Sequence, residues 1–273
     1  MDFELSSVGV AFTLTLIAGL STGIGSAIAF FAKRTNTNFL AISLGFSAGV
    51  MVYVSLVEIL QEGMAALSRD CGSTAGHWYA IMSFFGGILV IMIIDKLVPS
   101  FENPHEIRSV EAMQEAPQIH KKGLARMGLM SALAIGIHNF PEGIATFTAG
   151  LGSPEIAIPL TVAIAIHNIP EGIAVSVPIY YATGNKKKAF ILSFLSGLSE
   201  PVGAIIAFIM IYFFTGLSES VIGILFSSVA GIMVFISLDE LLPAAEKYGK
   251  HHQAIMGLVA GMLVMSVSLA LFN

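Results

Sequence analysis

The sequence predicts an all-α, polytopic membrane protein with eight transmembrane helices, on the basis of its apolar composition and of eight long apolar segments. Of its 273 residues, 55% are hydrophobic and 11% are charged, whereas a soluble domain has about 25% charged residues. The mean hydropathy of +0.84 indicates that the natural solvent of the chain is lipid. The net charge of -5 offers no basic surface, so nucleic acid is not expected as a partner.

Each predicted helix follows from the length rule, since a helix that crosses a bilayer needs about 20 mainly apolar residues. Acidic residues precede the first segment, where a signal peptide would carry Lys or Arg, so we expect it to be retained as a span. The single cysteine, Cys71, permits no disulfide within the chain. The eight segments are 8–32, 39–62, 77–98, 124–150, 155–182, 188–214, 217–243 and 253–272.

One long polar connection, at about 99–122, separates spans that are otherwise joined by short turns within a single transmembrane domain of residues 1–273. It contains His105 and His120 among several Glu residues. These side chains could gather metal, but a solvated loop is the simpler interpretation.

The distribution of Lys and Arg orients the spans, because cytoplasmic loops carry an excess of these residues. If loops one, three, five and seven are cytoplasmic, that side holds twelve of the thirteen, and only Arg69 lies outside. We therefore expect both termini outside and the 99–122 loop in the cytoplasm. The twelve residues are Lys33, Arg34, Lys96, Arg108, Lys121, Lys122, Arg126, Lys186, Lys187, Lys188, Lys247 and Lys250.

Two internal alignments predict an inverted repeat of spans 1–3 and 6–8 around spans 4 and 5. Residues 11–30 align with 189–208 at ten of twenty identical positions, and residues 48–60 align with 230–242 at eight of thirteen. By the charge distribution, the aligned spans cross the membrane in opposite directions. Inverted repeats form faces that open alternately around a site at mid-membrane, as in secondary transporters. An old duplication without a surviving mechanism is the alternative.

Two copies of one hexapeptide lie between the repeats, HNFPEG at 138–143 and HNIPEG at 167–172. On a helix, residues three or four apart share a face, so the His, Asn and Glu of each copy point the same way. Each helix then offers an imidazole nitrogen, an amide oxygen and a carboxylate to a shared cavity, and Glu200 in the sixth span adds a third carboxylate. The predicted metal ligands are His138, Asn139, Glu142, His167, Asn168, Glu171 and Glu200.

Prolines beside these carboxylates predict that three successive helices are interrupted near mid-membrane. Pro141, Pro170 and Pro201 lack the N–H that would bond the carbonyl four residues earlier. A free carbonyl at that depth must be buried in protein or line a polar cavity. The carbonyls expected to be free are those of Ile137, Ile166 and Gly197.

The cost of burying the three carboxylates argues that they have a function. On an insertion scale each central charge costs roughly 2.5–3.5 kcal/mol, so together they cost on the order of 8–10 kcal/mol. A bound dication offsets this cost, and protons can take its place when the site is empty. Polar contacts that only join helices are the alternative interpretation.

At these residues the chain resembles the ZIP (Zrt/Irt-like) metal transporters, most of all their bacterial zinc-uptake branch, over nearly its whole length. The paired hexapeptides carry the resemblance, with support from SGLSEP (196–201), SLVE (55–58) and DELLP (239–243). The resemblance implies eight helices arranged as three plus two plus three. It also implies a transport bundle that moves against a fixed scaffold, and often a homodimer.

The resemblance further implies a centre for two metal ions that share the carboxylates of Glu142 and Glu171. Met51 is a further, weaker ligand candidate for the first ion, and Glu58, Asp239 and Glu240 stay open between coordination and a role at a helix end or gate. The first position would use His138, Glu142, His167 and Glu171, and the second Asn139, Glu142, Asn168, Glu171 and Glu200.

The predicted function is uptake of divalent metal ions from the exterior to the cytoplasm by alternating access through this mid-membrane site. Zinc is expected first, with breadth to iron, manganese, cobalt or cadmium, because the ligands are nitrogen and oxygen without thiolate. One or two ions are bound as cargo, and no cofactor is expected. The chain is expected in the bacterial cytoplasmic (inner) membrane and not to be an enzyme. The alternatives are an intramembrane metal-dependent hydrolase and a channel-like metal pathway, although the sequence has no HExxH motif.

Overall fold

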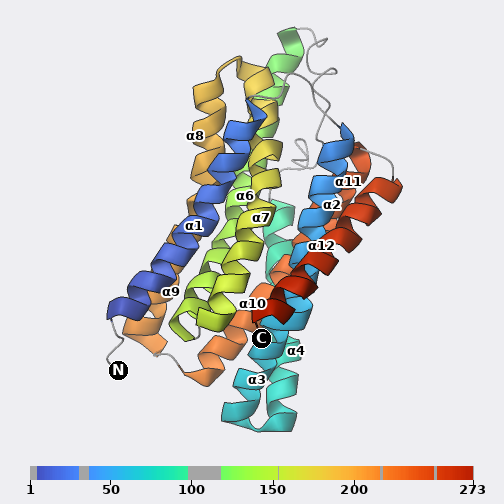
Figure 1. Ribbon diagram of the computed structural model, residues 1–273. Coiled ribbons are helices and arrows are strands. Elements are labelled where there is room, and N and C mark those ends of the chain that lie inside the picture. Colours follow the sequence, from blue (N-terminus) through green and yellow to red (C-terminus); the bar gives the residue numbers. More distant parts are fainter. Residues whose placement is uncertain are drawn as a thin grey trace.

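The computed structural model describes residues 5–30, 37–97, 118–152, 154–215, 218–248 and 251–272, and every regular element in these ranges is helical (Figure 1). Three runs contain a short π-helical turn, in which the backbone bonds reach one residue further than in an α-helix. The elements are α1 (Leu5–Ala29), α2 (Thr37–Val54), η1 (Ser55–Ile59), α3 (Leu60–Cys71), α4 (Ser73–Leu97), α6 (Gln118–Gly152), α7 (Pro154–Thr183), α8 (Lys186–Gly197), α9 (Ser199–Met210), η3 (Ile211–Thr215), α10 (Glu219–Ile236), η4 (Ser237–Leu241), α11 (Leu242–Tyr248) and α12 (His251–Phe272).

The predicted all-α membrane class is confirmed, and most predicted spans coincide with helices. Within the described ranges, seven helices are long and apolar enough to cross a membrane. The helix α6, which carries HNFPEG, is not among the seven, so the count of eight spans stays a prediction. The second predicted span, 39–62, continues beyond its predicted end, through η1 and α3 to Cys71.

The helix α6 begins at Gln118, so the last five residues of the predicted connection at about 99–122 are helical. The residues QIHKK (118–122) are polar except for Ile119 and include none of the Gly or Pro that would break a helix, and the backbone there is helical. His120 therefore lies in the first turn of α6, with its side chain outside the described part, and His105 lies wholly outside the described residues.

The helices form two groups that stand side by side in Figure 1. In the first group α1, α6, α7, α8 and α9 pack on one another, and in the second α2, α3, α4, α10, α11 and α12 do so. The groups meet where α2 and α12 pack on α7 and where α10 packs on α6. Both hexapeptides therefore lie in the first group, next to its contact with the second.

Glycines bring the main chains of neighbouring helices into direct contact. A Cβ atom added to Gly19 of α1 would lie 2.5 Å from the carbonyl oxygen of Gly197 in α8, and a Cβ added to Gly197 would collide with the carbonyl of Gly19. These two glycines occupy the same position in the aligned segments 11–30 and 189–208. The helices α1 and α8 therefore cross at equivalent residues.

The same correspondence extends to the other helices of the chain. Gly25 lies against the carbonyl of Ile169, and its aligned counterpart Gly203 lies against that of Phe140, the residue at the same place in the other hexapeptide. In the second group, Gly49 and Gly231 are also aligned. Gly49 meets the carbonyl of Leu258 in α12, and Gly231 meets that of Phe84 in α4.

The two π-helical turns of the second group also fall at aligned positions. Ser55–Ile59 and Ser237–Leu241 correspond residue for residue in the alignment of 48–60 with 230–242. A π-turn inserts an extra residue into a helix and is often found at functional sites. The aligned sequences therefore share an irregularity as well as a helix.

The predicted interruption of three helices at proline was wrong for two of them. The helices α6 and α7 continue through Pro141 and Pro170. Only the third is interrupted, at Leu198 between α8 and α9. Proline removes one intrahelical hydrogen bond, but neighbouring helices can keep such a segment straight, and here the glycine after each hexapeptide carboxylate packs on a neighbouring main chain.

The crossing of α1 and α8 predicts that Gly19→Ala destabilises the protein. The added methyl group meets a backbone carbonyl, which cannot move aside as a side chain can, and overpacking of this kind costs about 1–3 kcal/mol. Thermal unfolding in detergent micelles measures the effect. Gly86→Ala is the matched control, since a Cβ there meets nothing within 4 Å. Equal unfolding midpoints for the two variants would contradict the prediction.

Candidate metal centre

Three helices of the first group position the predicted ligands. Asn139 and Glu142 lie on α6, His167, Asn168 and Glu171 on α7, and Glu200 in the first turn of α9. All six side chains have 0% solvent exposure. His138 lies on α6 immediately before Asn139, and its side chain is outside the described part of the chain. The six described ligands are thus buried polar groups on adjacent helices.

A histidine and a carboxylate join α6 to α7. Nε2 of His167 lies 3.2 Å from Oε1 of Glu142, and both side chains are fully buried. The contact therefore pairs one residue from each hexapeptide copy. A nitrogen and an oxygen that face each other in a dry site are suitable ligands for a divalent cation such as Zn²⁺.

A second contact joins α7 to α9 and to α1. Nδ2 of Asn168 donates to Oε1 of Glu200 at 2.5 Å and to the carbonyl of Ala18 at 3.1 Å. Both donor protons of the amide are used in this way, so its oxygen is left for another partner. The contact explains how Glu200 is oriented in the site.

Several polar atoms of this centre have no hydrogen-bond partner within the described residues. A buried polar atom left unpaired costs about 1–3 kcal/mol, so such atoms are rare in folded proteins. Most of those found here are oxygens, which bind cations. They are Oδ1 and Nδ2 of Asn139, Oε2 of Glu142, Oδ1 of Asn168 and Oε2 of Glu200.

The structure brings four of the predicted ligands together as two pairs. In the described part of the chain, no three His, Cys, Asp or Glu side chains form a group that could hold a metal ion. The pairs are His167 with Glu142 and Asn168 with Glu200. The seven-residue ligand set stays a prediction.

Two serines that the sequence analysis missed hold the backbone beside Glu171. Ser26 on α1 donates to Oγ of Ser193 on α8 at 2.6 Å, and each hydroxyl lies 3.2 Å from the carbonyl oxygen of Gly172. All three residues are buried. Serine next to small residues in a membrane helix is the only signal for such a contact, and it does not reveal the partner.

The other candidate ligands lie in the second helix group. Met51 is fully buried in its apolar core. Glu58 lies in η1 and is partly buried, whereas Asp239 and Glu240 lie in η4, with Asp239 exposed and Glu240 partly buried. Metal coordination and a role at a helix end or gate therefore both stay open for Glu58, Asp239 and Glu240, and coordination by Met51 stays a prediction.

Comparison with known proteins identifies the group to which this arrangement belongs. The profile of the ZIP zinc transporter family matches residues 1–122 and 101–269. The chain belongs to the ZIP family. Relatives named zinc transporter ZupT share 58% identity over 281 residues in Clostridium perfringens, covering 98% of each chain. The relative of that name in Streptococcus mutans shares 62% over 262 residues, covering 96% of this chain and 97% of the relative.

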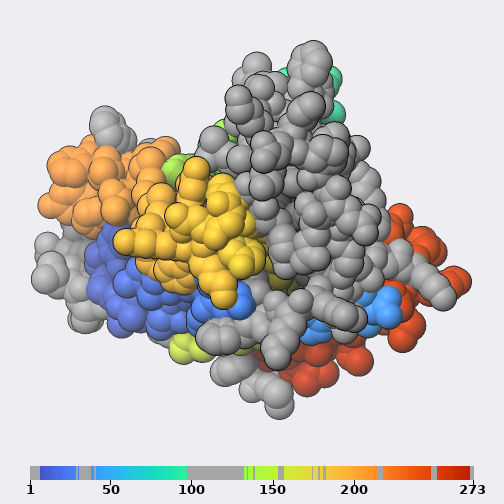
Figure 2. Space-filling model, turned by 90° about the horizontal axis from the view of Figure 1, so that it is seen from above, coloured from blue at the N-terminus to red at the C-terminus, as the bar shows by residue number. Residues whose placement is uncertain are grey.

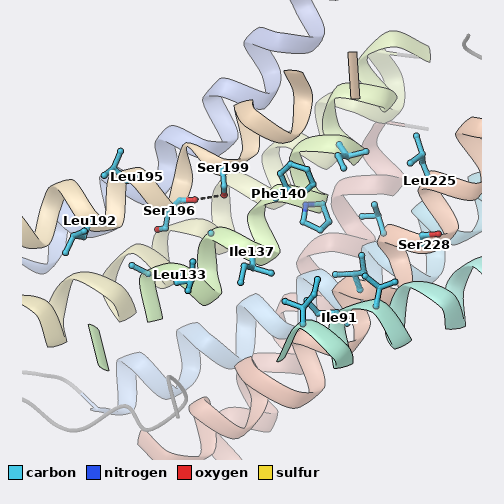
Figure 3. A pocket seen from close by; sticks show the side chains of 18 residues that line it. Ile91, Leu133, Ile137, Phe140, Leu192, Leu195, Ser196, Ser199, Leu225 and Ser228 are labelled. Atoms are coloured by element: carbon cyan, nitrogen blue, oxygen red, sulfur yellow. Dashed lines mark hydrogen bonds between the residues drawn. The ribbon is translucent and has the colours of Figure 1, made fainter. Parts of the chain in front are cut away.

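This ZIP chain also has an apolar cavity of about 690 Å³ between its two helix groups (Figure 3). Residues of α4, α6, α8, α9 and α10 line it, including Phe140 and Pro141 of the first hexapeptide. Among its hydroxyls, Ser196 and Ser199 each donate to a carbonyl of their own chain segment. The cavity therefore offers little to a cation and lies beside the metal centre as an apolar part of the boundary between the groups.

The contact between Asn168 and Glu200 predicts that Asn168→Ala destabilises the metal-free ZIP protein and weakens zinc binding. A buried carboxylate oxygen of Glu200 loses its donor, at a cost of about 1–3 kcal/mol. Thermal unfolding and isothermal titration with Zn²⁺ in detergent measure the two effects.

The matched control for this prediction is Asn185→Ala, which removes the N-cap bond from Lys188 N–H at the start of α8. This substitution lowers stability by about 1 kcal/mol and leaves zinc affinity unchanged. An Asn168→Ala protein with wild-type zinc affinity would contradict the assignment of this contact to the metal site.

Proposed function

We propose that this chain carries Zn²⁺ into the bacterial cytoplasm through the buried His, Asn and Glu side chains of α6, α7 and α9. Membership of the ZIP family makes the chain a membrane transporter for zinc and not an enzyme. The observation that carries the proposal is the set of buried, unpartnered oxygens on both hexapeptide helices and Glu200. Zinc is the cargo of this site.

The proposed ligand set is the one predicted from the sequence. His138, Glu142, His167 and Glu171 would hold one ion, while Asn139, Asn168 and Glu200 with the same two carboxylates would hold a second. Three carboxylates supply three negative charges, which balance most of the charge of two dications. The contacts His167–Glu142 and Asn168–Glu200 support this division, because each joins ligands assigned to the same ion.

The proposal extends the cargo from zinc to iron, manganese, cobalt and cadmium. Imidazole, carboxylate and amide ligands bind all of these dications, and selectivity among the dications depends mainly on the coordination geometry that the ligands impose. The only cysteine, Cys71, is exposed, and it lies at the end of α3 in the second helix group, so no thiolate is available to select Cu(I).

We also propose eight spans in an inverted repeat. The helix α6, fourth in chain order, is the span added to the seven candidates. The paired glycine contacts support it, since aligned residues make equivalent contacts in both halves. Ser21 and Ser199 are aligned as well, and they donate to the aligned carbonyls of Ala18 and Ser196, each at 2.6 Å. Equivalent contacts at aligned residues are what a twofold relation between the two halves requires.

The proposed mechanism is alternating access by movement of the first helix group against the second. The contact of His167 with Glu142 and those of Asn168 with Ala18 and Glu200 lie within α1, α6, α7 and α9. The boundary with the second group includes an apolar cavity, so a shift there breaks few polar contacts. The site can therefore travel with its ligands intact.

The proposed orientation places the start of α8 in the cytoplasm. Lys186, Lys187 and Lys188 are exposed there, and Figure 2 shows a face of the molecule at which α8, in yellow, reaches the surface. Lys96, at the end of α4, is exposed too, and the positive-inside rule places such residues inside. In Figure 1 the start of α1 lies toward the opposite end of the molecule from the start of α8, which agrees with an N-terminus outside.

The proposal includes a single transmembrane domain that forms a homodimer, as the family resemblance implies. The helix α4 is the least buried of the seven candidate spans in the described part of the chain. A stripe of exposed apolar side chains follows one face of it, at spacings of three and four residues: Trp78, Met82, Phe85, Leu89 and Ile93. This face is available to a second copy within the membrane.

The proposed site predicts that Glu142→Ala and Glu171→Ala abolish zinc uptake. Each substitution removes a carboxylate shared by both ion positions, so neither ion is held once its water is removed. Uptake of Zn²⁺ into proteoliposomes, read with a fluorescent zinc indicator inside, measures the loss.

Glu246→Ala is the control, since this exposed carboxylate pairs with His251 at 2.6 Å at the beginning of α12. We expect its uptake to match the wild type. Wild-type uptake by either hexapeptide variant, in protein that elutes as a single folded species, would refute the site.

A further inference from the structure

The Thr22 hydroxyl on α1 is an exception among the buried threonines of this protein. A threonine in a helix commonly donates to the carbonyl four residues earlier. Six described threonines do so at distances of 2.7–3.0 Å: Thr13, Thr15, Thr146, Thr148, Thr161 and Thr183. Oγ1 of Thr22 has no hydrogen-bond partner among the described residues, although the side chain has 0% exposure.

The metal centre explains why this hydroxyl lacks its usual partner. The carbonyl four residues before Thr22 belongs to Ala18, and it already accepts from Nδ2 of Asn168 at 3.1 Å and from Ser21 at 2.6 Å. The Thr22 side chain instead lies against Gly197, where an added Cβ would be 2.9 Å from its Oγ1. The position of the Thr22 side chain therefore depends on Asn168, a predicted metal ligand that occupies the carbonyl of Ala18.

Thr22 is the counterpart of Glu200 in the other half of the protein. The two residues are aligned in the segments 11–30 and 189–208. Their main chains also make equivalent contacts, because Gly172 of the second hexapeptide lies against the carbonyl of Thr22 and Gly143 of the first lies against that of Glu200. The centre thus has a carboxylate at one of two related positions and a hydroxyl at the other.

The shorter side chain leaves one side of the centre open. Asn168 donates to Glu200 at 2.5 Å. The related pair is Asn139 and Thr22, and here both polar atoms of the amide and the hydroxyl lack a partner among the described residues. Threonine is too short to reach as the glutamate does, so this side keeps unpaired groups that can bind a cation or one of its water molecules.

We propose that Thr22 is a specificity-determining residue of the metal site, where its hydroxyl holds a water ligand of the bound dication. The inference rests on the proposed function of the hexapeptide site. A hydroxyl at this position limits the site to three carboxylates. A fourth carboxylate would favour cations that prefer oxygen ligands, such as Mn²⁺, and would slow the release of any dication.

The test compares Thr22→Val, Thr22→Ser and Thr22→Glu in the full-length chain, reconstituted in proteoliposomes with Zn²⁺ or Mn²⁺ as the probe. Thr22→Val removes the hydroxyl without changing the shape, and we expect the KM for Zn²⁺ to rise about tenfold, as for a lost hydrogen bond to a charged group. Thr22→Ser stays within about twofold of wild type in KM, because serine offers the same hydroxyl as threonine, with one donor proton and two acceptor lone pairs. Thr22→Glu raises the ratio of Mn²⁺ to Zn²⁺ uptake and lowers the maximal rate.

The thermal stability of the metal-free protein separates a role in binding from a role in folding. Replacing an unpaired buried hydroxyl by a methyl group leaves stability unchanged or raises it, so Thr22→Val should weaken zinc uptake without destabilising the protein. Thr15→Val on the same helix is the matched control, because its hydroxyl donates to Ala11 at 3.0 Å. We expect it to lower stability and to leave KM and metal preference unchanged.

The inference is overturned if Thr22→Val matches Thr15→Val in KM and in metal preference. This result decides the question even if Thr22→Glu fails to fold. Glu171→Ala, measured in parallel, reports on the proposed function: wild-type uptake by that variant rejects the site as a whole. Loss of uptake by Glu171→Ala with no effect of Thr22→Val rejects the role of Thr22 alone.

Discussion

Direct main-chain contact at glycine is the constraint on which the metal centre depends. Gly143 lies against the carbonyl of Glu200, and Gly172 against that of Thr22. With any side chain at these positions the helices would separate, and Asn168 could not reach Glu200 at 2.5 Å. Small residues allow this approach in membranes, where helices gain no hydrophobic free energy by leaving lipid. The last residue of each hexapeptide therefore places the ligands by allowing neighbouring helices to touch.

The polar groups brought together in this way set a second requirement, which is charge. Three carboxylates are fully buried on adjacent helices, and burial of each without compensation costs roughly 2.5–3.5 kcal/mol in the centre of a membrane. The bond from Asn168 satisfies one oxygen of Glu200, and His167 faces one oxygen of Glu142. One oxygen of Glu142 and one of Glu200 keep no hydrogen-bond partner among the described residues, and the charge of a bound dication would offset the cost of burying them.

The sequence predicted the helices, the paired hexapeptides and the correspondence of residues 11–30 with 189–208, because composition and repeated letters record these directly. It could not predict the partners. That Ser26 and Ser193 meet at the carbonyl of Gly172 depends on how three helices cross. The prediction of a break at Pro141 and Pro170 failed because a missing N–H was treated as a local event, whereas packing on neighbouring helices keeps α6 and α7 continuous.

Departures from symmetry between the halves are as informative as the symmetry itself. Helices α1 and α8–α9 contact at equivalent glycines, yet only the second is interrupted, at Leu198, two residues before Glu200. That interruption lets the first turn of α9 present a carboxylate to Asn168, whereas the continuous α1 presents a hydroxyl at the related position. A site with identical halves would present the same groups to a cation from both sides. Here one side is closed by a hydrogen bond and the other is left open, so a duplicated framework yields a proposed site whose two sides present different groups to a cation.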